Sequence, residues 1–320
     1  MRVALIGYGN VGKAFARLLA RQQSAYPFRI VGIHTRTHGT AVDLKGLPVE
    51  PRFGPAASSL DDFLDRSQPE VVVEITTLNP ESGEPAISHI RSAFARGLHV
   101  ITANKGPIAH AYADLREQSR RAQAEFRFES TVMDGAPVFN TLRNNLPGVK
   151  VLGFTGVLNS TSKIVIAALQ RGLSLEDGIR EAQSMGIAEA DASFDIDGWD
   201  SAAKAAALAN VLMDARTTPQ AVEREGIRTL TTAEAMELAS AGETAVLVSR
   251  GERAGSAVRL EVKPEIVPCT DLLATLQGTS NLVLFHTDLM GTVGTISINP
   301  GIEQTAYGLF IDLVDIARCV

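Results

Sequence analysis

The first 130 residues alternate short apolar runs with segments of helical periodicity. In Val11–Arg21, for example, Phe15, Leu18 and Leu19 fall on one side of a helix. The other predicted helices here are Ala86–Arg96 and Gly106–Ala124, and the predicted strands are Arg2–Ile6, Arg29–Ile33, Val71–Ile75, Leu98–Thr102 and Phe126–Phe128. Because these strands are apolar throughout rather than alternating, we expect a doubly wound parallel sheet of the α/β class, covered on both faces.

The pattern changes after Pro137. The predicted helices there are Ser162–Gln170, Leu175–Gln183 and Asp200–Leu212, and the predicted strands are Lys150–Leu158, Ala245–Arg250, Val258–Ile266, Asn281–Thr287 and Thr292–Ile298. Hairpin-like spacing predicts an α+β domain with a mixed or antiparallel sheet and helices on one face. We expect the last helix, Ile302–Ala317, to pack on the first domain. The predicted domains are therefore residues 1–136 completed by 301–320, and a catalytic domain at 137–300.

A glycine-rich loop joins the first predicted strand to the first helix. Gly7, Gly9 and Gly12 satisfy the pattern G-x-G-x-x-G, with Asn10 and Val11 between the last two. In this context the first glycine permits the tight turn, the second lets the backbone approach a pyrophosphate, and the third allows close packing of helix and strand. The helix N-terminus then presents free N–H groups to the phosphates. We therefore predict a Rossmann dinucleotide site, the alternative being a tight turn with no ligand.

The end of the second predicted strand bears on the choice of dinucleotide. An NAD site usually has an acid there to hold the ribose 2′-hydroxyl. The stretch from His34 to His38 contains no acid, and Asp43 is the first to follow. Thr35 and Arg36 could instead hold a 2′-phosphate, because a guanidinium fork suits phosphate oxygens. We expect NADP, while NAD stays possible and Arg36 has the alternative of being a solvated loop charge.

Composition and charge indicate a globular protein and argue against nucleic-acid-binding, disulfide-rich and membrane-spanning classes. The chain is 45% hydrophobic and 21% charged, which is typical of a globular protein. A net charge of −6 without a basic stripe argues against nucleic-acid binding. Cys269 and Cys319 are too few for a disulfide framework, and neither a signal peptide nor an apolar run of membrane-spanning length occurs. We expect a cytoplasmic protein with no membrane partner and a small-molecule substrate.

Two lysines are candidates for chemistry. Lys105 follows the fourth predicted strand, at the edge where open α/β sheets bind ligands, although an exposed lysine at a helix start is an equal alternative. Asp200 and Lys204 are four residues apart on a predicted helix that is apolar almost all round. A charge pair on a buried helix is costly unless it lines a pocket or is fully paired. This favours a site over the alternative, a surface salt bridge.

Several motifs, taken in order along nearly the whole chain, resemble homoserine dehydrogenase. They are Thr102-Ala103-Asn104-Lys105, Thr131-Val132 with Gly135 and Pro137, Leu158-Asn159-x-Thr161, Gly186-Ile187-Ala188-Glu189-Ala190-Asp191 followed by Asp195, Gly198, Asp200 and Lys204, and Gly301 with Thr305-Ala306. The resemblance implies reduction of L-aspartate 4-semialdehyde to L-homoserine with NADPH or NADH. It also implies a homodimer formed through the sheet of the catalytic domain. Because the sequence leaves no room after residue 320, we do not expect feedback inhibition through a regulatory ACT domain.

The resemblance assigns roles residue by residue. Lys204 is expected to be the main acid/base lysine, Lys105 a second catalytic and substrate-binding lysine, and Glu189 the ligand of the substrate ammonium group. Asp195 and Asp200 are expected to position the substrate and Lys204. Lysine ammonium groups suit a reaction in which hydride addition builds negative charge on an aldehyde oxygen. The expected cofactor contacts also include Thr76, Thr102, Lys105 and Gly301, and the expected monovalent-cation ligands, a Na⁺ site for example, lie at Glu129, Val132, Asp134 and Ala136.

Two stretches of the chain depart from the family pattern. Met133 and Asp134 replace two glycines of a stretch that is usually TVGGG-x-P, and Lys163 adds a cation where the family has LNGTTN. Side chains in a glycine loop restrict the approach of backbone to a ligand. Two alternatives therefore stay open: an oxidoreductase of this type for another small hydroxy or oxo amino acid, and a dinucleotide-binding sensor without catalysis.

Overall fold

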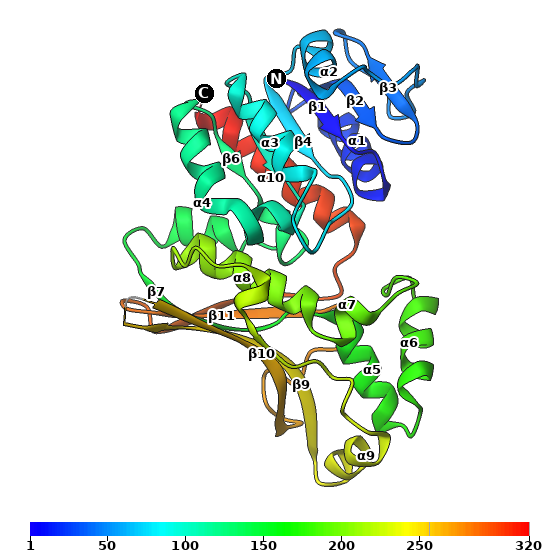
Figure 1. Cartoon of the computed structure of the whole chain (residues 1–320), viewed down its shortest axis with the longest axis vertical. Helices are drawn as coiled ribbons and strands as arrows, with labels where there is room; N and C mark the ends of the chain where they lie inside the picture. Colours follow the sequence, from blue (N-terminus) through cyan, green and yellow to red (C-terminus); the bar gives the residue numbers. More distant parts are fainter. Residues whose placement is uncertain (256, 320) are drawn as a thin grey trace. The chain divides into compact units, whose positions relative to one another are not determined.

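The computed structural model describes residues 1–255 and 257–319, which divide into two compact units (Figure 1). Unit 1 comprises Met1–Pro137 together with the C-terminal segment from Gly301 onward, and unit 2 comprises Val138–Pro300. Ser256 lies outside the described residues, as does Val320, which the first predicted domain includes. No helix of the described chain is both long and apolar enough to cross a membrane.

In its described residues, unit 1 contains a six-stranded sheet with the order β3-β2-β1-β4-β5-β6. The strands are β1 (Arg2–Ile6), β2 (Arg29–Thr35), β3 (Gly39–Val42), β4 (Val71–Glu74), β5 (His99–Thr102) and β6 (Phe126–Arg127). All neighbours pair in parallel except β3, which returns antiparallel to β2 at the edge. The predicted parallel sheet is confirmed, and the edge strand β3 was not predicted.

The strand order reverses direction at β1. From β1 the chain proceeds to β2 on one side, and it then returns to place β4 on the other side of β1. In open α/β sheets, such a switch point opens a crevice at the carboxyl ends of the strands, where ligands bind. The glycine loop after β1 and the segment Ile75–Thr76 after β4 both lie at this crevice.

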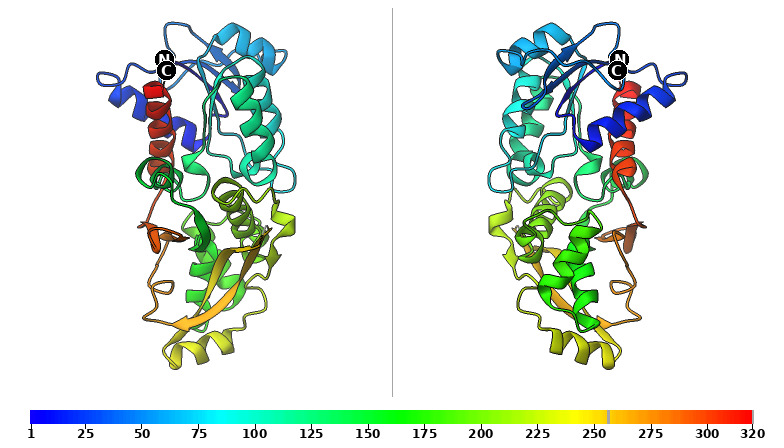
Figure 2. Two further views of the ribbon diagram at one scale, coloured as in Figure 1. Left: turned by 90° about the vertical axis from the view of Figure 1, so that its left-hand side faces the viewer. Right: turned by 90° about the vertical axis from the view of Figure 1, so that its right-hand side faces the viewer.

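Helices cover both faces of the sheet in unit 1. They are α1 (Asn10–Gln22), α2 (Leu60–Ser67), α3 (Ala86–Ala95), α4 (Lys105–Arg121) and α10 (Ile302–Cys319), with a 3₁₀ turn at Glu129–Thr131. Figure 2 shows α1 and α10 on one side of the sheet and α2, α3 and α4 on the other. Phe15 of α1 and Leu309, Phe310 and Leu313 of α10 share one buried apolar cluster with the sheet. The last helix therefore completes the core of unit 1.

Unit 2 contains, in its described part, a second six-stranded sheet with the order β12-β11-β7-β9-β10-β8. The strands are β7 (Val151–Val157), β8 (Glu223–Arg224), β9 (Glu243–Ala254), β10 (Ala257–Pro268), β11 (Asn281–Thr287) and β12 (Thr292–Ser297). Neighbours are antiparallel except β8, which pairs in parallel with β10. The prediction of a mixed or antiparallel sheet is confirmed.

The described part of unit 2 contains the helices α5 (Ser160–Gln170), α6 (Leu175–Ser184), α7 (Ser193–Ile196), α8 (Trp199–Leu212) and α9 (Thr232–Ser240), with a 3₁₀ turn at Pro219–Ala221 and a short π-helix at Thr141–Asn145. α8 packs on β9 and β10, while α5 contacts β9 and carries α6 on its other side. Six of the ten buried residues of α8 are alanines. Because alanine side chains are small, α8 can approach the elements packed against it closely. A polar side chain on α8 then lies near these elements.

Candidate active site

The candidate site of unit 2 begins at the N-terminus of α5. Asn159 is the N-cap residue, and its Oδ1 atom accepts a hydrogen bond from the backbone N–H of Ser162 at 2.8 Å. This is the usual way to satisfy a free N–H group in the first turn of a helix. Because the cap uses the Oδ1 atom, the Nδ2 group of the same amide is left to donate to other partners.

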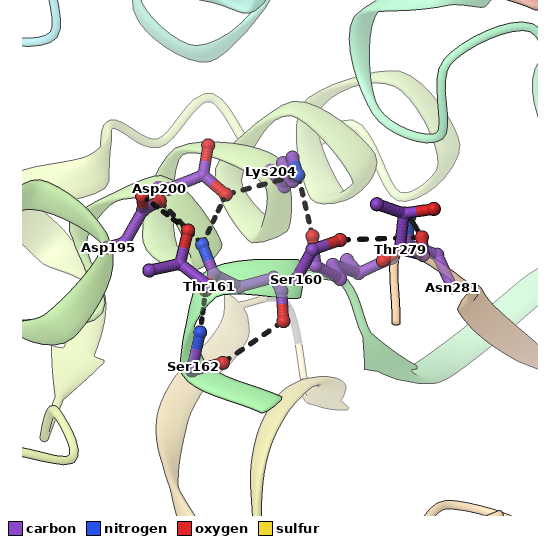
Figure 3. A network of polar contacts seen from close by, with 10 residues as sticks. Ser160, Thr161, Ser162, Asp195, Asp200, Lys204, Thr279 and Asn281 are labelled. Atoms are coloured by element: carbon purple, nitrogen blue, oxygen red, sulfur yellow. Dashed lines mark hydrogen bonds and ion pairs between the residues drawn. The ribbon is translucent and has the colours of Figure 1, made fainter. Parts of the chain in front are cut away.

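The Asn159 amide joins two carboxylates. Its Nδ2 atom donates to Oδ1 of Asp195 at 2.7 Å and to Oδ2 of Asp200 at 3.0 Å. Thr161 donates from Oγ1 to the other oxygen of Asp195 at 2.9 Å. An amide has two N–H donors, so one side chain satisfies both acids. The two carboxylates are thereby held side by side (Figure 3).

Lys204 completes the cluster from α8. Its Nζ atom lies 3.1 Å from Oδ2 of Asp200 and donates to the carbonyl oxygen of Leu158 at 2.6 Å. The side chains of Lys204 and Asp200 are only 15% and 10% exposed. The alternative of a surface salt bridge is therefore wrong. A buried pair of this kind holds a lysine ammonium group in a fixed position.

The cluster perturbs the titration of Asp195. Burial raises the pKa of this carboxyl group, and the negative charge of Asp200 raises it further. Hydrogen bonds from Asn159 and Thr161, and the charge of Lys204, act in the opposite direction. Desolvation and a like charge both disfavour the ionised form. A perturbed carboxyl group beside a buried lysine is typical of a functional site.

In unit 1 the glycine loop has the geometry that its sequence predicts. Gly7 has φ of +103°, and a Cβ atom there would meet the carbonyl oxygen of Ile75 at 2.5 Å. Gly9 is the N-cap of α1, and a Cβ atom there would meet nothing within 4 Å. The backbone of Gly9 thus borders open space at the N-terminus of α1. This geometry fits the pyrophosphate of a dinucleotide.

A buried glutamate organises the carboxyl ends of β4 and β5. Glu74 is fully buried and accepts hydrogen bonds from the Oγ1 atoms of Thr76 and Thr102. Thr102 in turn accepts from the backbone N–H of Asn104, and the Asn104 amide donates to the carbonyl oxygen of Thr76. The predicted cofactor residues Thr76 and Thr102 are therefore brought together by Glu74. The sequence signal for Glu74 was an acid closing the apolar run Val71–Val73, and it was missed.

The turn after β2 leaves Arg36 exposed. The hydroxyl group of Thr35 is occupied within the turn, where it donates to the carbonyl oxygen of Gly39 and accepts from the N–H of His38. Arg36 forms no hydrogen bond or ion pair with any described residue. Beside the glycine loop, a cavity of about 320 Å³ is lined by three basic side chains and one acidic side chain, Lys13, Arg17, His38 and Glu50.

The chain matches two family models. One, described as homoserine dehydrogenase, matches residues 137–314, and another, described as the NAD-binding domain of homoserine dehydrogenase, matches residues 7–129. The homoserine dehydrogenase of Methanocaldococcus jannaschii is 33% identical, with 99% of this chain and 98% of that protein covered. The chain belongs to the homoserine dehydrogenase family. The NAD(+)-dependent homoserine dehydrogenase of Pseudomonas canavaninivorans is 32% identical, covering 98% and 96% of the two chains.

Solved homoserine dehydrogenase structures share the fold. A putative homoserine dehydrogenase from Archaeoglobus fulgidus superposes with a TM-score of 0.88 at 25% identity and 99% coverage of both chains. A hyperthermophilic archaeal homoserine dehydrogenase in complex with NADPH gives a TM-score of 0.84 at 26% identity, covering all of this chain and 98% of that one. The predicted α/β fold with a Rossmann domain and an α+β domain is confirmed.

Glu189 belongs to unit 2 and Lys105 to unit 1. The Glu189 side chain is exposed, and the structure records no contact between it and Asp195, Asp200 or Lys204; its backbone carbonyl accepts from Gln183. Lys105 is the first residue of α4, and Asn104 caps this helix by accepting a hydrogen bond from the backbone N–H of Gly106. The roles that the homoserine dehydrogenase pattern gives to these two residues stay predictions.

The departure at Asp134 has a local explanation. Asp134 adopts φ of +57°, a left-handed conformation that glycine favours and aspartate tolerates. Its Oδ1 atom accepts from Oγ1 of Thr305 at 3.2 Å, near the start of α10. Met133 is fully buried. Met133 therefore contributes to the core of unit 1, and Asp134 contributes a loop contact to α10. Gly301, which directly precedes α10, is exposed.

The departure at Lys163 places a second cation near the cluster. The Lys163 Nζ atom donates to the carbonyl oxygen of Ser280. Burial lowers the pKa of Lys163 to about 7, and the positive charge of Lys204 contributes to this shift. Lys163 therefore lies close enough to Lys204 for the two ammonium groups to repel each other. Sequence reasoning noted the extra charge but not its burial.

Proposed function

We propose that this protein interconverts L-homoserine and L-aspartate 4-semialdehyde by hydride transfer to and from a nicotinamide dinucleotide. One observation carries the proposal: the buried Asp200–Lys204 pair, which Asn159 links to Asp195. Membership of the homoserine dehydrogenase family supports the same reaction.

The chain's own residues have distinct parts in this reaction. The nicotinamide cofactor, when bound, supplies or accepts the hydride. Lys204 donates a proton to the substrate oxygen in the reducing direction and takes it back in the oxidising direction. Asp200 orients the Lys204 ammonium group, and Asp195 binds and positions the substrate. A lysine ammonium group in a site with little water stabilises the negative charge that develops on the oxygen.

Initial rates with L-homoserine and NAD or NADP test the proposal. We expect turnover by the unmodified protein and a fall of kcat by roughly 10²- to 10⁴-fold in Lys204→Met, the usual contribution of a general acid–base group. Lys150→Met removes an exposed lysine and is the matched control. Absence of turnover with homoserine, together with turnover of another hydroxy amino acid, would contradict the assigned substrate.

We further propose NADP as the preferred cofactor. The exposed Arg36 guanidinium group directly after β2 and the basic side chains of the adjacent cavity support recognition of a 2′-phosphate. Arg36→Ala should raise the KM for NADP and leave the KM for NAD unchanged, because NAD lacks the phosphate. Equal effects on both cofactors would contradict this assignment. Glu50→Ala tests the alternative that NAD is the preferred cofactor. Loss of an acid that holds a ribose hydroxyl group would weaken the binding of NAD instead of NADP.

A monovalent cation is proposed at residues 129–136. No group of three or more candidate metal-binding side chains occurs among the described residues, so a cation there would be held largely by backbone oxygens. Glu129 and Val132 are buried and Asp134 is in a left-handed turn, which suits a loop that presents carbonyl oxygens. The cation would order this loop beside Ala136. Replacing Na⁺ by choline should lower the melting temperature, and an unchanged melting temperature would contradict the proposed site.

A homodimer is proposed as the oligomeric state. β12 is an edge strand of the unit 2 sheet, and Ile296 on this strand and Ile298 just after it are 49% and 76% exposed. An exposed apolar edge strand is a common pairing surface. Sedimentation velocity at low micromolar concentration should give the mass of two chains, and a monomer would refute the proposal.

We also propose a cytoplasmic location. Cys269 and Cys319 are both free and exposed in the structure, which suits a reducing compartment. Cell fractionation would test this, and recovery with an exported fraction would contradict it.

A further inference from the structure

A second cavity lies within unit 2. It has a volume of about 450 Å³ and is bounded by α5, α6, the start of β9 and residues 273–278. Lys163 and Ala167 line it from α5, one helical turn apart. None of the residues in the Asp195–Asp200–Lys204 cluster lines this cavity. The cavity is therefore distinct from the cluster, although α5 borders both.

The charge of Lys163 is poorly compensated in this cavity, because Glu181, the carboxylate that lines it, is paired with Arg171. Its recorded partner is one neutral group, the carbonyl oxygen of Ser280, and no carboxylate of the described residues forms an ion pair with it. An ammonium group in a largely buried position without a counter-charge is costly. Burial and the repulsion by Lys204 accordingly bring the pKa of Lys163 down to about 7. A bound anion would relieve this cost.

Part of the cavity wall is apolar. Val246, Leu273 and Leu276 line it, and the first two belong to the buried cluster on the sheet of unit 2. Small-molecule sites combine such an apolar wall with a few polar groups that fix orientation. We propose that this cavity binds a small aliphatic carboxylate, with its carboxylate group ion-paired to Lys163 and its aliphatic body against Val246, Leu273 and Leu276.

Binding of this kind takes up a proton near neutral pH. The anion favours the charged form of Lys163, so the amine that is partly neutral in the free protein becomes protonated in the complex. Affinity should consequently fall as the pH rises above about 7. A carboxylate bound to backbone N–H groups would show no such dependence in this range.

Calorimetric titration with butyrate tests the proposal, with butyramide as the neutral probe of equal shape. We expect butyrate to saturate one site at pH 6.5 and butyramide to give no saturable signal. Lys163→Met should weaken butyrate binding by about tenfold or more, because a hydrogen bond to a charged group is lost. Lys150→Met, at an exposed lysine, should bind as the unmodified protein does.

Two further measurements distinguish this cavity from the substrate site. Ala167→Leu adds a larger side chain to the cavity wall while leaving Lys163 in place, so it should weaken butyrate binding; it decides the matter alone if Lys163→Met does not fold. Butyrate binding should also persist in saturating L-homoserine. Displacement by homoserine, equal binding of butyramide, or full binding by Ala167→Leu would each overturn the proposal.

Discussion

The Nζ atom of Lys204 lies 3.1 Å from Oδ2 of Asp200, one helical turn away on α8. Because they are four residues apart, the two side chains lie on the same face of α8. Most of the buried side chains of α8 are small alanines, and the pair lies close to the segment between β7 and α5. Separation of the pair would leave a charge buried without its partner. The position of the Lys204 ammonium group thus depends on Asp200.

Asp200→Asn tests this dependence. We expect kcat with homoserine to fall at least tenfold and the pH profile of the oxidation rate to move to lower pH. The reason is that protonated Lys204 loses an anionic neighbour, so its proton leaves at lower pH. Steady-state rates between pH 6 and 10 measure both effects. Asp114→Asn, at an exposed aspartate of α4, is the control; an unchanged profile in Asp200→Asn would contradict the assigned role.

Asn159 should matter for stability as well as for the site. The residue is 2% exposed and caps α5 while it joins Asp195 and Asp200. Asn159→Ala should lower the free energy of unfolding by about 1–3 kcal/mol, the cost of leaving buried polar groups without partners. Asn159→Asp should be worse, because it adds a third negative charge.

Urea unfolding measures both Asn159 variants. The exposed Asn144 supplies the control Asn144→Ala, for which we expect almost no change. If Asn159→Ala matched this control, the two hydrogen bonds to the carboxylates would not contribute to the stability of unit 2.

The titration of Lys163 predicts a pH dependence of stability. Its pKa is about 7 in the folded chain and 10.5 in an ordinary environment. Between these values the unfolded chain binds more protons than the folded chain, so stability rises with pH. The free energy of unfolding should therefore increase, relative to Lys163→Met, by at most about 1.4 kcal/mol per pH unit from pH 7 to pH 10. Urea unfolding at several pH values measures the difference, and a difference that is constant with pH would be inconsistent with burial of the amine.

Two glycines of the cofactor loop should respond differently to alanine. Gly9→Ala meets no atom within 4 Å and has an ordinary φ of −78°, so stability should be unchanged. The added methyl group would, however, occupy space that the pyrophosphate needs, and the affinity for NADP should fall. Gly7→Ala should be destabilising, because of its positive φ and the nearby carbonyl oxygen of Ile75. Thermal melting and cofactor titration separate the two effects, and normal NADP binding by Gly9→Ala would contradict the loop assignment.

Strong periodicity made most elements of the fold predictable. Strands such as Arg2–Ile6 and Asn281–Thr287 have the predicted bounds. The missed elements are short or carry a weak apolar pattern. β3 is four residues long and forms by a turn from β2, and α2 and α9 bury few residues each. The capping signals at Ser59 and at Thr231 with Glu234 were present in the sequence, and they mark the starts of α2 and α9.

The site was predictable where its residues share one element. Asp200 and Lys204 follow from spacing on a single apolar helix, and the structure confirms that they pair. The bridge by Asn159 was not predictable in the same way, because it joins α5 to α7 and α8, about 40 residues further along the chain. A contact of that range depends on tertiary packing rather than on local pattern.

The closing of unit 1 by α10 has a consequence for synthesis. The ribosome makes the chain from its N-terminus, so all of residues 138–300 emerge before α10 does. Until then Phe15 and the sheet beside it lack the apolar surface of Leu309, Phe310 and Leu313. Unit 2, which is continuous in sequence, can reach its final form first. Until α10 is made, residues 1–137 of unit 1 therefore keep an exposed apolar face. A chaperone would be of most use at this stage of synthesis.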